Sequence, residues 1–161
     1  MRSKRGPTSP VALPADPLLD IALDHLSLGR AHLGLALTSG ASPDFAEAAE
    51  HLDRAVDGLR QSGRDDCLPW GLLARTALHR FRDAIDAAAA DLGDVEEIAG
   101  RGHMRLHEAD VHLEWTRLRL RTGDGQAARD HFEKAREIVT STVDGRRERE
   151  VAWLDRVLTD S

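Results

Sequence analysis

An apolar signature of three residues returns along this chain with a fixed period of 40 residues. Its copies are Ala48, Leu52 and Ala55; Ala88, Leu92 and Val95; and Ala128, Phe132 and Ala135. Within each copy the spacing is i, i+4, i+7, which places the three side chains on one face of an α-helix. A period of this size is typical of folds that stack pairs of helices. Such folds build an extended surface, so we expect a binding function rather than a catalytic one.

The composition also favours helix. Ala, Leu, Arg, Asp and Glu dominate the 161 residues, Tyr is absent, and β-branched residues are sparse. The net charge is −6, whereas a protein that binds nucleic acid usually carries a basic excess, so we expect no nucleic-acid partner. No apolar run is long enough to cross a membrane, so we expect no membrane partner either.

The cysteine content indicates the compartment. Cys67 is the one cysteine of the sequence, so no intrachain disulfide can form, which fits the reducing cytoplasm. Residues 1–15 have no apolar segment after their basic start, and they contain Pro7, Pro10 and Pro14. We therefore expect a flexible leader or linker there, not a secretion signal.

Apolar spacing and breaker residues predict seven helices and no strand. The expected ranges are 16–38, 44–60, 68–81, 85–99, 104–121, 126–139 and 146–158. They group into pairs at about 16–63, 64–102 and 103–140, and the helix at 146–158 closes the end. The predicted fold is thus all-α: a right-handed α-solenoid of three antiparallel helix pairs plus a C-terminal capping helix. The domain is expected to span residues 16–161.

The second helix of two pairs resembles a known family. The segments at 44–55 (DFAEAAEHLDRA) and 123–135 (GDGQAARDHFEKA) look like the second helix of a tetratricopeptide repeat. Leu33-Gly34 resembles the Leu-Gly pair of the family's first helix, and Leu28-Gly29 competes with it. The period of 40 exceeds the usual 34 and also approaches that of HEAT and armadillo repeats, the alternative structural reading. The resemblance covers about residues 17–140, and lengthened repeats of this kind are found in bacterial signalling proteins.

The resemblance implies a binding groove lined by the first helix of each pair. The corresponding partner-binding positions in this chain are Trp70, Arg80, Phe81, Asp110, Arg117 and Arg121. Arginines beside an exposed aromatic side chain suit an acidic or aromatic peptide. No cofactor is implied.

One polar stripe resembles a metal site. His103 and His107 are four residues apart, and Asp110 and Glu114 continue the same helical face. We interpret this stripe as a solvated face and predict no metal site. Cys67 follows Asp65 and Asp66, which disfavour a thiolate, so it is a poor nucleophile. Without a phosphate-binding loop or a nucleophile elbow, we expect no enzymatic activity.

The first helix carries more apolar residues than one buried face needs. Leu18, Ile21, Leu28 and Leu35 follow a second face, which would be exposed at the end of a solenoid. An exposed apolar patch usually marks an interface. We expect self-association through these four residues as a homodimer; an upstream domain or the leader are the alternative covers.

These observations favour a protein-protein interaction scaffold or sensor module that binds a peptide or protein. It would be either free-standing or part of a larger signalling protein. The alternative is a helical sensor that binds a small ligand between its helices.

Overall fold

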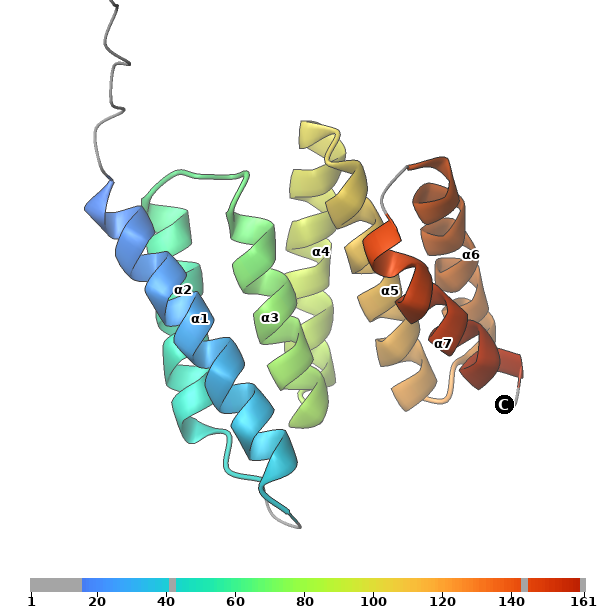
Figure 1. Cartoon of the computed structure of the whole chain (residues 1–161), viewed down its shortest axis with the longest axis horizontal. Helices are drawn as coiled ribbons and strands as arrows, with labels where there is room; N and C mark the ends of the chain where they lie inside the picture. Colours follow the sequence, from blue (N-terminus) through green and yellow to red (C-terminus); the bar gives the residue numbers. More distant parts are fainter. Residues whose placement is uncertain (1–15, 41–42, 143–144, 160–161) are drawn as a thin grey trace, which may run out of the picture.

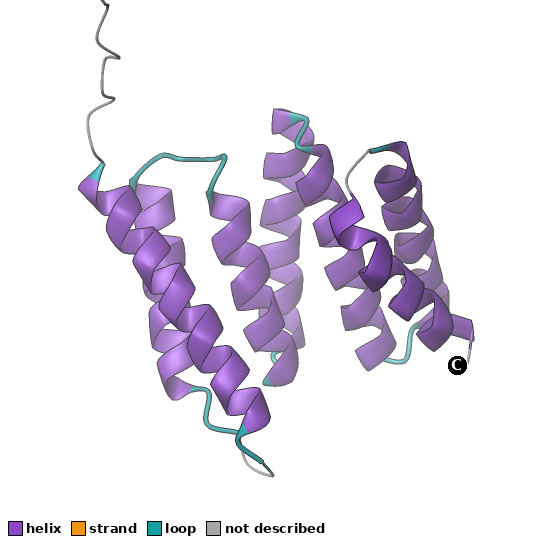
Figure 2. Cartoon of the chain, in the orientation of Figure 1, coloured by secondary structure: helices purple, strands orange, loops and turns teal. Residues whose placement is uncertain are grey.

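The computed structural model describes residues 16–40, 43–142 and 145–159 of the chain, and within these ranges it contains helices and loops but no strand (Figures 1 and 2). The helices are α1 (Pro17–Thr38), α2 (Ala46–Gln61), α3 (Leu68–Phe81), α4 (Ile85–Gly102), α5 (Arg105–Arg121), α6 (Gly125–Ser141), the short 3₁₀ helix η1 (Gly145–Arg147) and α7 (Glu148–Thr159). The predicted all-helical fold is confirmed. The predicted leader at 1–15 lies outside the described residues.

Local chemistry sets the helix ends. The Asp16 side chain accepts hydrogen bonds from the backbone N–H groups of Leu18 and Leu19, and Pro17 follows it in the first turn of α1. The Asp124 side chain caps α6 by accepting from the N–H of Ala127 at 3.1 Å. The turn before it needs Gly123, whose φ of 77° lies in the left-handed region.

Helices that follow one another in the chain pack against one another. The most extensive contacts join α1 to α2, α3 to α4 and α5 to α6, and smaller ones join these pairs in series. Figure 1 shows this order running from α1 at one end to α6 and α7 at the other. One cluster of buried side chains extends from Ala22 of α1 to Leu118 of α5, and another joins α5, α6 and α7.

The repeated signature forms the core, as predicted. All nine of its side chains are at most 2% exposed. Ala36, Thr76 and Thr116, each twelve residues before a signature alanine, are buried as well. The 40-residue sequence period therefore corresponds to a structural period in both helices of each pair.

A glycine lets α1 approach α2 closely. A Cβ built on Gly29 would lie 2.6 Å from the side chain of Leu52, whereas one on Gly34 would meet nothing within 4 Å. Gly29 is therefore the glycine that helix packing requires, whereas Leu28 beside it is exposed and Leu33 is buried. Among the described residues, no helix combines the length and apolarity that crossing a bilayer would need.

Candidate functional site

A hollow of about 650 Å³ lies where side chains of α1, α3, α5, η1 and α7 converge. We call it the groove. Its lining residues are Arg30, Trp70, Leu73, Ala74, Leu106, His107, Asp110, Glu114, Arg117, Arg147 and Glu150. These come mainly from the first helices of the pairs, so the groove lies on the surface where the sequence predicts a partner to bind.

The apolar part of the groove presents a tryptophan to solvent. Trp70 is 43% exposed and Leu106 is 38% exposed. The Trp70 ring meets the His107 ring edge-on, with centroids 6.2 Å apart, and Arg30 donates a hydrogen bond to the Trp70 carbonyl oxygen at 3.4 Å. Leu106 lies in the first turn of α5 and lines the groove.

The charged part of the groove is held together by ion pairs. Arg117 bonds Glu114 at 2.6 Å and also pairs with Glu150 of α7. Arg147 bonds Asp110 at 2.6 Å and Glu150 at 3.2 Å. These contacts tie η1 and α7 to α5, so the C-terminal helix completes the wall of the groove.

The groove is nearly neutral overall. Its lining contains three arginines and three carboxylates. His107 adds no charge near pH 7, because burial lowers the pKa of its ring and Arg147 acts in the same direction against the opposing effect of Asp110. Since Arg117 and Arg147 are already paired with carboxylates, the groove suits an occupant with both polar and apolar groups better than a strongly acidic one.

Several polar atoms around the groove have unused hydrogen-bonding capacity. Within the described residues, His107 Nδ1, Glu114 Oε2 and Arg80 Nε are buried and make no hydrogen bond. Arg80 Nε lies 3.5 Å from Glu114 Oε2, so that pair is a long ion contact. Buried polar atoms without partners are costly, and a bound ligand could supply the missing partner.

Three of the six predicted partner-binding residues line the groove, and three do not. Trp70, Asp110 and Arg117 line the groove. Arg80 lies behind Glu114, with its guanidinium 4.6 Å from the centre of the Phe81 ring, and neither residue lines the groove. Arg121 also lies outside the lining and bonds the exposed Asp83 at 2.6 Å.

Other lining residues were not predicted as partner contacts; they are Arg30, Ala74, Leu106, His107, Glu114, Arg147 and Glu150. Two of them belong to η1 and α7, which the sequence assigned to a solvating cap. The alternation of Arg and Glu at 146–150 was the available signal, because such residues can pair with α5 as well as face solvent.

The predicted His103–Glu114 stripe is not continuous. His103 is the C-cap of α4, with a left-handed φ of 50°, so it does not share a helix with His107. His107, Asp110 and Glu114 remain together in the groove. The Cys67 thiol is buried, and burial followed by the charge of Asp66 raises its pKa, which agrees with an unreactive thiol.

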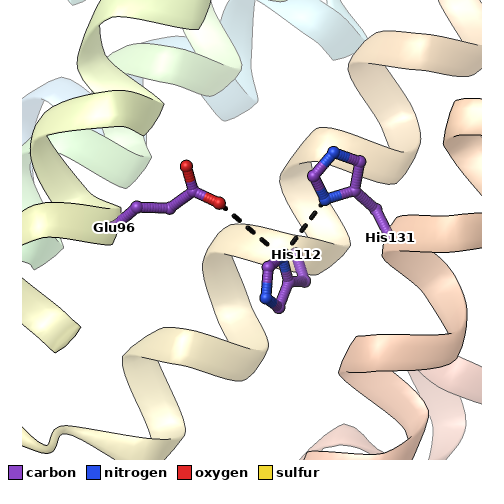
Figure 3. A group of neighbouring side chains, drawn as sticks. All are labelled: Glu96, His112 and His131. Carbon is purple, nitrogen blue, oxygen red and sulfur yellow. Dashed lines mark hydrogen bonds and ion pairs between the residues drawn. The ribbon is translucent and has the colours of Figure 1, made fainter.

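A separate histidine cluster lies between α4, α5 and α6. His112 Nδ1 is 3.2 Å from His131 Nδ1 and 3.9 Å from Glu96 Oε1 (Figure 3). Burial lowers the pKa of His112 to about 4, with His131 and Lys134 acting in the same direction, so the ring is neutral at pH 7. A similar contact joins His25 of α1 to His51 of α2, with the Nδ1 atoms 2.8 Å apart.

The second apolar face of α1 is exposed. Leu18, Ile21, Leu28 and Leu35, the four residues expected to mediate self-association, are between 46% and 62% exposed. Leu37 is exposed as well. The chain therefore presents an apolar strip along its first helix.

Comparison with known proteins identified no relative: no family model, curated protein or solved structure matches this chain.

Proposed function

We propose that this chain is a protein-interaction module whose groove binds a segment of a peptide or protein partner. In this proposal the helix pairs form a right-handed solenoid like that of tetratricopeptide repeats, and the groove lies on its concave side. The observation that carries the proposal is Trp70, a large aromatic side chain that is 43% exposed beside a hollow of about 650 Å³. Exposed tryptophans next to a pocket commonly anchor a binding partner.

The groove also offers specificity. Leu106 extends the apolar surface beside Trp70, and His107 Nδ1, which makes no hydrogen bond within the described residues, could bond a polar group of a peptide backbone. The ion pairs of Arg117 and Arg147 would exclude an occupant that has no polar group to replace the water they lose on binding. A partner segment with an apolar or aromatic side chain flanked by polar groups fits this arrangement.

Replacing Trp70 should weaken the binding of a peptide strongly. Peptides selected from a random display library against the intact chain are expected to bind Trp70→Ala at least about tenfold more weakly, because a buried aromatic anchor contributes much of the binding free energy. Fluorescence polarisation with the selected peptides measures the loss. Trp153→Ala is the matched control, since Trp153 of α7 is exposed but lies outside the groove lining. Equal binding by wild type and Trp70→Ala would remove the groove from the proposal.

The alternative function, binding of a small ligand, uses the same hollow. Its volume falls within the range of small-molecule sites, but many of its polar groups are already paired to one another. A ligand screen by thermal shift distinguishes the two: small molecules that stabilise the wild type but not Trp70→Ala, with no peptide recovered, would favour the sensor.

We further propose that the exposed strip on α1 mediates a homodimer. The double variant Ile21→Glu/Leu28→Glu should remain monomeric at concentrations where the wild type dimerises, because the charges would be buried in the interface. Light scattering over a concentration series measures the mass, and Ala46→Glu on α2 adds one such charge outside the strip as a control. A monomeric wild type at the highest concentration contradicts the dimer.

A further inference from the structure

Three side chains from three different helices converge outside the groove. They are Glu96 of α4, His112 of α5 and His131 of α6, and each offers one ligand atom within 4.8 Å of the other two (Figure 3). Figure 3 shows the Glu96 carboxylate to the left of the His112 ring and the His131 ring to its right, with both dashed lines meeting at His112. Among the described residues no other such group of metal-ligating side chains is present.

The distances resemble those of a metal site without its ion. In a tetrahedral zinc site with bonds of about 2.0 Å, neighbouring ligand atoms are about 3.3 Å apart. The two Nδ1 atoms are 3.2 Å apart, and Glu96 Oε1 is 3.9 Å from His112 Nδ1. Because Glu96 is the most exposed of the three, a rotation of its side chain can shorten the longer distance without moving a helix.

The two imidazoles are held in place by their surroundings. The His131 ring stacks on the Trp115 ring, with centroids 5.4 Å apart and planes at 17°. Both rings are partly buried between α5 and α6, which limits their rotation. Lys134 and Arg119 also lie near the cluster, and their positive charge opposes a cation, so the Glu96 carboxylate is the ligand that supplies a negative charge.

The first repeat contains a pair of histidines that can be compared with His112 and His131. His51 and His131 occupy the same position in the first and third copies of the repeat, each three residues after the first signature alanine. His51 also contacts a histidine of its partner helix, His25. No carboxylate among the described residues completes a three-ligand group there. The pair at 25 and 51 is therefore a hydrogen-bonded pair of rings, whereas the pair at 112 and 131 is completed by Glu96 of α4, which belongs to the neighbouring helix pair.

We propose that Glu96, His112 and His131 bind one divalent transition-metal ion, with zinc as the best fit, and that the ion joins α4, α5 and α6. Two imidazoles and one carboxylate suit zinc, cobalt or nickel and not magnesium or calcium, which prefer all-oxygen ligands. Each ring must be the tautomer that carries its proton on Nε2, so that Nδ1 can bind the metal. Three protein ligands leave a fourth position for water.

The test is a zinc titration of the full chain after chelator treatment and without an affinity tag. Calorimetry is expected to give one zinc per chain, cobalt should give the visible absorption of a tetrahedral site, and magnesium should give no binding. Glu96→Gln and His131→Gln should each weaken zinc binding by at least about tenfold, the lower end of what loss of even an outer-shell partner causes. Glu96→Gln tests the site without disturbing the core, because this side chain is exposed.

His51→Gln is the matched control. It removes a histidine from the equivalent position of the first repeat and should leave both the stoichiometry and the affinity for zinc unchanged. Equal zinc affinity in wild type, Glu96→Gln and His131→Gln would overturn the proposal and leave His112 and His131 as a hydrogen-bonded pair. An equal loss in His51→Gln would overturn it too, because zinc would then be bound by histidines in general.

Discussion

Phe132→Ala is expected to lower the free energy of unfolding by about 3–5 kcal/mol. Phe132 is the largest side chain of the repeated signature and is 2% exposed. It packs in the cluster that joins α5, α6 and α7, together with Leu113 and Leu154. Truncation leaves a cavity that these helices can fill only by moving together, and the surrounding side chains lose their contacts. Urea unfolding followed by circular dichroism measures the change.

The control for this prediction is Trp153→Ala. Trp153 is also a large aromatic side chain of the C-terminal region, but it is 51% exposed on α7. Its truncation should change the unfolding free energy by less than about 1 kcal/mol. If Phe132→Ala also costs less than about 1 kcal/mol, the repeated signature is not the core that its burial indicates.

The helices could be predicted from the sequence because the signals for them are local. Alanine and leucine at helical spacing, the breakers Gly63 and Gly123, and the caps Asp16 and Asp124 all act within a few residues of where they stand. The predicted ends agree with the structure to within a few residues; helix 68–81 matches α3, Leu68–Phe81, at both ends.

The composition of the groove was less accessible, because its walls come from distant parts of the chain. Trp70 and Asp110 were predicted through the first-helix pattern. Arg147 and Glu150 were not, since their contact with α5 depends on how η1 and α7 fold back. Leu106 was not predicted either, because the apolar residues of α5 do not gather on one face of the helix.

The cluster of Glu96, His112 and His131 was missed for a similar reason. The sequence analysis examined histidines at i, i+4 on one helix, whereas this cluster uses one side chain from each of three helices. A signal was nevertheless present. His32 and His112, like His51 and His131, are two repeat periods apart, so the first and third repeats carry histidines at equivalent positions in both helices.

The second repeat carries Asp91 at the position of His51 and His131. Asp91 is buried, with its side chain 7% exposed, and Arg75 of α3 binds both of its carboxylate oxygens, at 2.7 and 2.9 Å. His79 Nε2 lies 3.6 Å from the same carboxylate. Burial lowers the pKa of His79, so the ring is neutral near pH 7 and cannot replace the charge of Arg75. The same position of the repeat thus joins the two helices of each pair by a polar contact, between two histidines in the first and third pairs and between Asp91 and Arg75 in the second.

Asp91→Asn is therefore expected to lower the free energy of unfolding by about 2–4 kcal/mol, because it leaves the Arg75 guanidinium buried without its main counter-charge. The cost falls toward the lower end because Arg75 also bonds the exposed Asp53 at 3.1 Å. Thermal and urea unfolding measure the loss.

Two further variants distinguish the cost of leaving a buried charge unpaired from the stability that the ion pair itself contributes. Asp94 lies on α4, like Asp91, and forms an exposed ion pair with Arg60 of α2. Asp94→Asn breaks this pair and should cost less than about 1 kcal/mol. The double variant Arg75→Met/Asp91→Leu should recover most of the stability, since an apolar pair of similar volume avoids the desolvation of both charges. If Asp91→Asn is as stable as Asp94→Asn, the Arg75–Asp91 contact does not hold α3 and α4 together. If the double variant is less stable than Asp91→Asn, the geometry of the ion pair itself, rather than the neutralisation of a buried charge, joins these helices.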